Sequence, residues 1–173
     1  MKKLLIKTNL MKILLLFFAI TGLSCTSCAQ KNSKADIWSG TYVLRSSNGN
    51  SGATAIDTLV IEQADKADDK IPVKYKSDLS RWTLTAKKDT KDKVTIRRFL
   101  FDLENEENEY DQFGWTDLHV KGKMNCIDGG HFFICQTEPN TTVKFNKEES
   151  FFTKTGILAI WLHHGLFELE KIK

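Results

Sequence analysis

The chain has 173 residues, of which 41% are hydrophobic and 27% charged, and a formal net charge of +3. The first 27 residues hold four of the 25 Lys and Arg residues and none of the 22 Asp and Glu residues, which leaves 21 basic against 22 acidic residues and a net charge of −1 for the remainder. This balance gives no basic surface for nucleic acid, so no nucleic acid partner is expected, and the length suits one domain with its own hydrophobic core.

The chain begins with the features of a secretory signal peptide. Four lysines precede an unbroken apolar run at residues 13–20, and small residues follow the run. This is the pattern of a cleaved leader, and the run is shorter than the roughly 20 residues that a membrane-spanning helix needs. We expect residues 1–27 to be removed as a signal peptide, whether translation starts at Met1 or at Met11. A polar tether is then expected at residues 28–36 and a single domain at residues 37–173.

Three processing routes compete at residues 22–30, GLSCTSCAQ. Thr26 and Ser27 stand directly before Cys28, and Ser24 stands directly before Cys25. Both patterns resemble the signal that marks a bacterial lipoprotein cysteine for attachment of a lipid. Cleavage after Ala29 is the third route. Lipidation at Cys28 leaves the two later cysteines as an even pair in an oxidising compartment. We therefore expect a lipid on Cys28, with Cys25 as the alternative, and a product exported and anchored to the bacterial cell envelope. The third route gives a soluble periplasmic or secreted protein.

Most of the chain after the tether is predicted to form short strands. The expected strands are, in chain order, residues 37–47, 55–63, 71–77, 81–88, 93–103, 115–126, 131–137, 142–148 and 166–172. Aromatic and β-branched residues fill them, and turn residues separate most of them at spacings of about a dozen residues. This rhythm predicts an all-β, mainly antiparallel fold, either a barrel or a sandwich.

Two segments break the rhythm. Residues 104–112, ENEENEYDQ, are expected to form an acidic, solvated loop. Residues 157–164, ILAIWLHH, form an apolar run between two glycines, and periodicity cannot separate a short helix from a fully buried strand at this length. The Ala and Leu content favours a helix, with Gly165 as its C-terminal cap and two histidines at the negative end of its dipole.

The segment WSGTY at residues 38–42, followed by eight or nine short strands and closed by GLFELEKI at 165–172, resembles a small lipocalin-like barrel of bacterial exported lipoproteins. In lipocalins a tryptophan beside a glycine on the first strand plugs the closed end, whereas Trp38 and Gly40 stand here in the reverse order. The resemblance implies a barrel of about 8–9 strands, and we place one short helix in it near residues 157–164.

A hairpin is predicted at IDGGHFFI, between Cys126 and Cys135, because glycine accepts the positive φ of tight turns. A two-residue loop at Gly129 and Gly130 would set the cysteines diagonally, whereas a four-residue loop at 129–132 would set them directly opposite. We expect a disulfide between Cys126 and Cys135, with two buried free thiols as the alternative.

No residue set indicates metal or catalytic chemistry. The available soft ligands are Cys126, His131, Cys135, His119, His163 and His164, but they lack the tight spacings of zinc sites. The chain contains no nucleophile elbow, no H-E-x-x-H, no P-loop and no Gly-rich dinucleotide turn. The carboxylates of residues 104–112 are expected to be solvated alike, which does not suit acid–base catalysis. We expect no metal, no cofactor, no catalytic residue and no enzyme activity.

Aromatic residues are more numerous than a small core needs, and some are expected to line a ligand site. The expected ligand-binding residues are Trp82, Trp115, Phe99 and Phe101. We therefore expect a non-enzymatic cell-envelope lipoprotein that contacts the membrane through its lipid and binds an apolar small ligand. The alternative is a periplasmic inhibitor or immunity-type lipoprotein that binds a protein partner through exposed loops such as residues 104–112. A third alternative is an enzyme with no recognisable motif.

Overall fold

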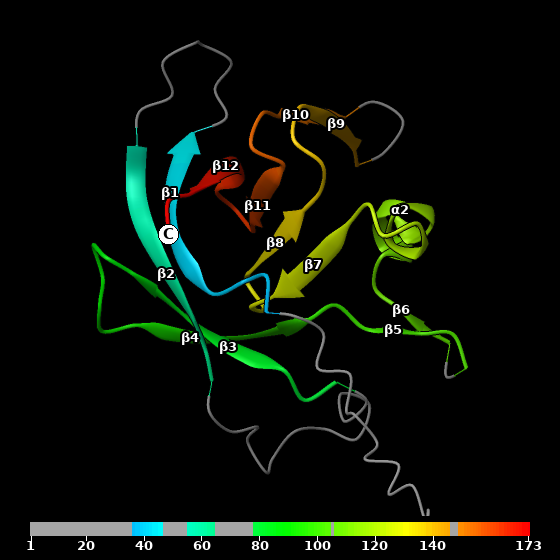
Figure 1. The fold of residues 1–173 in the computed structure, drawn as a ribbon, viewed down its shortest axis with the longest axis horizontal. Helices are drawn as coiled ribbons and strands as arrows, with labels where there is room; N and C mark the ends of the chain where they lie inside the picture. Colours follow the sequence, from blue (N-terminus) through cyan, green and yellow to red (C-terminus); the bar gives the residue numbers. More distant parts are fainter. Residues whose placement is uncertain (1–35, 47–54, 65–77, 105, 146–148) are drawn as a thin grey trace, which may run out of the picture. The chain divides into compact units, whose positions relative to one another are not determined.

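The structure, a computed structural model, describes residues 36–46, 55–64, 78–104, 106–145 and 149–173 (Figure 1). The expected leader, both candidate lipidation sites, Cys28 and Cys25, and the expected strand at 71–77 lie outside these residues. Within the described ranges, no helix is long and apolar enough to cross a membrane.

Eight strands form a closed antiparallel barrel. They are β1 (Gly40–Ser46), β2 (Ala55–Gln63), β3 (Arg81–Ala86), β4 (Lys93–Arg98), β7 (Asn125–Asp128), β8 (Phe132–Gln136), β11 (Ile157–Trp161) and β12 (Gly165–Lys171). Each strand pairs with the previous and the next of these in chain order, and β12 pairs with β1 to close the sheet. This is an up-and-down barrel, in which no barrel strand is left as an edge. The prediction of an all-β, mainly antiparallel barrel is confirmed.

The inward side chains of the barrel fill its interior, as expected for eight strands. We call this set the interior cluster: Trp38, Tyr42, Leu44, Leu59, Ile61, Trp82, Leu84, Ile96, Ile127, Phe132, Ile134, Ile157, Ala159 and Leu169. None of these residues is more than 7% exposed. Because side chains alternate between the two faces of a strand, the neighbours of these residues point outward.

A covering layer buries part of the outer face of the barrel (Figure 1). It consists of β5 (Phe101–Asp102), β6 (Glu107–Asn108), the 3-10 helix η2 (Asp111–Phe113) and α2 (Thr116–Val120), which lie between β4 and β7, and of β9 (Thr141–Lys144) and β10 (Ser150–Thr153), which lie between β8 and β11. Its core, which we call the covering cluster, contains Phe99, Tyr110, Trp115, Met124, Cys126, Cys135, Val143, Phe151 and Leu158.

Two expected elements were wrong, and the covering layer explains both. Residues 157–164 form strand β11 and a turn instead of a short helix. β11 pairs with β8 on one side and β12 on the other. Leu158 belongs to the covering cluster and Ala159 to the interior cluster, so both faces are apolar and the alternation typical of a strand is lost. Gly165, with a φ of 93°, is a turn residue rather than a helix cap.

The expected strand at 115–126 is also different, because it contains the short helix α2 before β7 begins. The His119 N–H donates to the Trp115 carbonyl in a helical bond of 3.0 Å. The Trp115 indole donates to the Lys144 carbonyl at 2.6 Å, which joins the start of α2 to β9. The hydrogen bonds from the His119 N–H to the Trp115 carbonyl and from the Lys121 N–H to the Asp117 carbonyl hold residues 116–120 in a helical turn instead of an extended strand.

The predicted disulfide is confirmed: Cys126 pairs with Cys135 across β7 and β8, with their Cα atoms 4.1 Å apart. This is the directly opposed register that the four-residue loop predicted. The Gly129 N–H also donates to the Phe132 carbonyl at 2.9 Å, which tightens the turn. Both cysteines are buried in the covering cluster, so the bond lies between the barrel wall and the layer above it.

Replacing both cysteines, Cys126→Ala with Cys135→Ala, is expected to lower the free energy of unfolding by about 2–3 kcal/mol. The bond closes a short loop, and it restricts the unfolded chain accordingly. Equilibrium urea unfolding of the oxidised proteins measures this. A reductant should lower the stability of the wild type and leave the double variant unchanged. Equal urea midpoints for the oxidised wild type and the variant would contradict the prediction.

Candidate binding site at one end of the barrel

The two ends of the barrel are built differently. In an up-and-down barrel, alternate connections lie at the same end, so the turns β3–β4, β7–β8 and β11–β12 share one end with the last residue of β1 and the first residue of β2. We call this end the mouth. The other end carries residues 36–39, the end of β2, the start of β3 and the end of β4, and we call it the sealed end.

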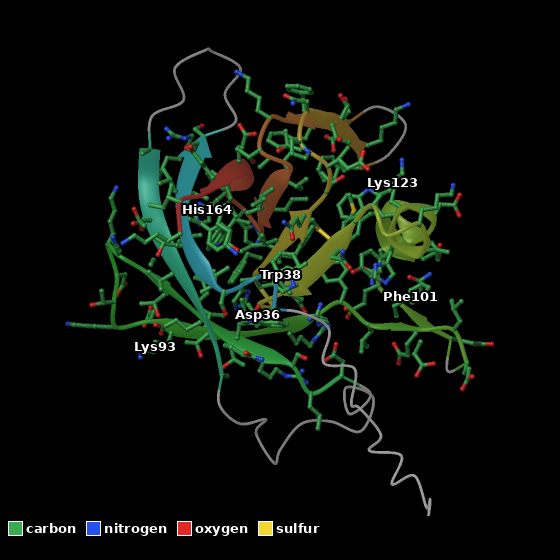
Figure 2. All side chains as sticks on the ribbon, in the orientation of Figure 1. Asp36, Trp38, Lys93, Phe101, Lys123 and His164 are labelled. Carbon is green, nitrogen blue, oxygen red and sulfur yellow. A yellow bond between two sulfur atoms is a disulfide. The ribbon has the colours of Figure 1, made fainter. Side chains whose placement is uncertain are left out.

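Hydrogen bonds to Asp36 close the sealed end. Its Oδ1 accepts from the Trp38 N–H at 3.0 Å, the Ser39 N–H at 3.1 Å and the indole Nε1 of Trp82 at 2.9 Å. Figure 2 labels Asp36 and Trp38 next to each other where the chain enters the barrel. Partial burial raises the pKa of Asp36, but the donors from Ser39, Trp38 and Trp82 outweigh it and hold this pKa below its ordinary value.

The guanidinium of Arg98 also lies at the sealed end. The Arg98 guanidinium lies 5.1 Å above the centre of the Trp82 ring, and its Nε lies 3.1 Å from Oδ2 of Asp78. The hydroxyl of Tyr42 donates to the Trp38 carbonyl. Polar contacts therefore cover the interior cluster at this end, and the large aromatic side chains of Trp38 and Trp82 lie beneath them.

The mouth is less covered within the described residues, where Asp57 accepts from the Thr58 and Lys88 N–H groups. Five apolar side chains there pack against the interior cluster but remain partly exposed: Ile56, Ala86, Val94, Trp161 and Phe167. Each lies within three residues of the mouth end of its strand. We call these five the mouth cluster.

Aromatic contacts give the mouth cluster a firm base. The Trp161 ring stacks on Phe132 with centroids 4.5 Å apart, and it meets Phe167 edge-on at 6.2 Å. Phe132 itself is buried. Next to Trp161, Leu162 is 50% exposed at the start of the β11–β12 turn. The arrangement is a partly exposed apolar surface, packed on the buried ring of Phe132, that a small ligand could cover.

The four residues expected to line a ligand site do not come together. Trp82 is 1% exposed and belongs to the interior cluster near the sealed end. Trp115 and Phe99 are buried in the covering cluster, and Phe101 packs against it. Their aromatic side chains form two packing cores instead of one pocket.

Sequence reasoning gave no ligand role to Trp161 and Phe167, although both are aromatic and lie on the last two strands of the barrel. Trp161 was assigned to an expected helix, which hid its inward direction. The pairs Trp161–Phe132 and Phe167–Ala159 show that both side chains point to the interior. The signal that could have found them is the turn at 162–164 followed by Gly165, which is typical of a hairpin.

The acidic segment 104–112 is anchored in part. The Arg97 guanidinium donates to both carboxylate oxygens of Glu109, at 2.7 and 2.8 Å, and to Asp128 at 2.6 Å. Tyr110 is buried, and its hydroxyl oxygen accepts from the Cys126 N–H at 3.0 Å. The expectation of an evenly solvated loop was therefore wrong for Glu109 and Tyr110, because both fasten the covering layer to the barrel.

The four histidines lie in two places. His119 stacks on Tyr110 in the covering layer, with ring centroids 4.0 Å apart. His131, His163 and His164 lie on two adjacent mouth turns, which are joined by a 2.9 Å bond from the Leu162 N–H to the His131 carbonyl. In the part of the chain that the structure describes, no three His, Cys, Asp or Glu side chains are placed to hold a metal ion.

No protein-family model, curated protein or solved structure matches this chain. The class of protein is therefore defined by its architecture: a closed eight-stranded up-and-down β-barrel with one sealed end, an apolar mouth and a disulfide-bonded covering layer.

Proposed function

We propose that the protein is a non-enzymatic binding protein of the bacterial cell envelope, which binds an apolar small ligand at the mouth of its barrel. A closed β-barrel is compatible with a binding role. The observation that carries the proposal is the difference between the two ends: one is closed by polar contacts, and the other presents partly exposed aromatic and aliphatic side chains.

The ligand is proposed to lie on the mouth cluster rather than deep in the barrel. A void large enough for a small molecule would leave accessible area on the side chains around it, yet no residue of the interior cluster is more than 7% exposed. Covering Trp161 and Phe167 would remove apolar surface from water, which is favourable at about 25 cal/mol per Å². The stacking of Trp161 on Phe132 holds this surface in place before the ligand arrives.

Export and anchorage form part of the same proposal. They are supported by the leader at residues 1–27 and by the small residues before Cys28 and Cys25. Protein extracted from membranes should carry the acyl mass on an N-terminal peptide that begins at Cys28. A mature N-terminus at Gln30 without lipid would contradict the anchored form and leave the binding role in place.

The variant Trp161→Ala is expected to weaken binding of a neutral apolar dye, such as Nile red, by about tenfold, which corresponds to about 1.4 kcal/mol. The substitution removes the largest partly exposed surface of the mouth cluster. Dye fluorescence titrated with the full chain measures the affinity. The control is Phe152→Ala, because Phe152 is an exposed aromatic residue of the covering layer, 52% exposed, and lies on β10.

A second function, protein binding through the β5–β6 turn, is favoured by one observation. Leu103 is 64% exposed in this turn, between the acidic residues Asp102 and Glu104. An apolar residue flanked by carboxylates suits a basic protein partner. The dye experiment distinguishes the two sites. If Leu103→Ser lost dye binding and Trp161→Ala kept it, the binding site would lie in the covering layer, and the proposed site at the mouth would be wrong.

A further inference from the structure

The turns around the mouth carry an excess of positive charge. The β3–β4 turn and its flanks contain four exposed lysines, Lys87, Lys88, Lys91 and Lys93, and only two acidic residues, Asp89 and Asp92. Within the described residues, none of the four lysines forms an ion pair. In Figure 2, Lys93 marks this turn and His164 marks the β11–β12 turn.

The other mouth turns add no acidic side chain to offset this charge. The β7–β8 and β11–β12 turns carry His131, His163 and His164, all exposed.

The acidic groups nearest in sequence to the mouth are mostly engaged elsewhere. Asp128 binds Arg97 at 2.6 Å, and Glu168 on β12 accepts from the backbone N–H groups of Lys154 and Thr155, at 2.5 and 2.9 Å, on the outer face of the barrel. Asp57 accepts from the backbone N–H groups of Thr58 and Lys88, at 2.6 and 3.3 Å, at the base of the β3–β4 turn. When Asp57, Asp89 and Asp92 are counted against the four lysines, one positive charge at this turn is left for a bound group.

We infer that the ligand is a single-chain amphiphile with an anionic headgroup, a carboxylate or a phosphate, whose chain covers the mouth cluster while its headgroup meets the lysines of the β3–β4 turn. This inference rests on the proposed function and specifies its ligand class. Lysine ammonium groups attract such anions as point charges over about a Debye length. The cation at the sealed end, Arg98, is instead paired with Asp78 and lies over the Trp82 ring.

The experiment compares dodecanoate, dodecyl phosphate and dodecanol, each below its micelle concentration, as competitors of Nile red on the full chain. The three share one chain length and differ in the headgroup. We expect both anions to bind at least about fivefold more tightly than the alcohol at low salt, as one or two weakly screened charge contacts would give. This difference should shrink as the salt concentration rises to about 0.5 M.

Two variants locate the headgroup. Lys87→Gln with Lys88→Gln, and Lys91→Gln with Lys93→Gln, should each weaken both anions by about threefold to fivefold and leave dodecanol unchanged. The matched control is Lys121→Gln with Lys123→Gln, which removes two exposed charges from the covering layer next to α2. The control should leave all three affinities unchanged.

Five outcomes would overturn the inference. Equal affinities for dodecanol and dodecanoate, or equal losses of all ligands in the lysine variants, would refute the anionic headgroup and leave the proposed apolar site intact. Failure of every amphiphile to displace a dye whose binding depends on Trp161 would refute this ligand class. Absence of any dye binding would remove the proposed function as well. Association with vesicles of anionic phospholipid, without binding of the monomers, would indicate a membrane-docking surface instead.

Discussion

Trp82→Ala is expected to lower the free energy of unfolding by about 4 kcal/mol, which is typical of large aromatic side chains removed from a core. Trp82 is almost fully buried in the interior cluster. Its loss would leave a cavity, remove the indole donor to Asp36 and leave the Arg98 guanidinium without the ring beneath it. The sealed end should therefore loosen together with the core.

Equilibrium urea unfolding of the full chain measures this change. The matched control is Trp161→Ala, the same substitution at a partly exposed position of the mouth, which should cost no more than about half as much. The two variants should separate stability from binding: Trp82→Ala loses stability, and Trp161→Ala loses dye affinity. A stable Trp82→Ala variant with weakened ligand binding would show that Trp82 lines the ligand site, as the sequence indicated.

The protein is expected to lose about 4 kcal/mol of stability between pH 10 and pH 12 through two buried tyrosines. Burial, with a smaller contribution from Asp36, raises the pKa of Tyr42 from 10.0 to about 12. Burial also raises the pKa of Tyr110 from 10.0 to about 12, assisted by Glu109 and opposed by the Cys126 N–H and Arg98. Below pH 10 both tyrosines are neutral in the folded and unfolded chains, so their full contribution to stability is present.

Above pH 10 the unfolded chain releases these protons before the folded chain does, so stability falls as the pH rises toward 12. Each pKa unit corresponds to about 1.4 kcal/mol when the difference in ionisation is complete, and between pH 10 and pH 12 each tyrosine contributes about 2 kcal/mol. Urea unfolding at pH 9, 10, 11 and 12 measures the slope. Tyr42→Phe and Tyr110→Phe should each reduce this slope by about half, even though each removes a hydrogen bond at neutral pH. Identical slopes in the wild type and both variants would contradict the assignment.

The barrel could be predicted because most of its strands have one apolar and one polar face. In β3, for example, Trp82 and Leu84 are buried inside, while Thr83 and Thr85 remain on the less apolar outer side. β11 lacks this contrast, because the covering layer buries its outer face as well. A strand that is apolar on both faces cannot be separated from a helix by its pattern alone.

The candidate site could not be predicted, for the same physical reason. The sequence shows which residues are aromatic, but it does not show that Trp115 packs outside the barrel and Trp82 inside it. That division depends on the pairing of β4 with β7, which sends residues 99–124 over the outer wall. The disulfide, in contrast, could be predicted, because it depends only on the local register of one hairpin.

The place where the chain enters the barrel has a consequence for orientation. Asp36 is fastened at the sealed end, so whatever precedes it in the chain joins the barrel at the end opposite the mouth. A lipid on Cys28 would be separated from this point by eight residues, which span at most about 30 Å when fully extended. The protein would then be attached by its base, and a ligand could enter and leave at the mouth without passing the point of attachment.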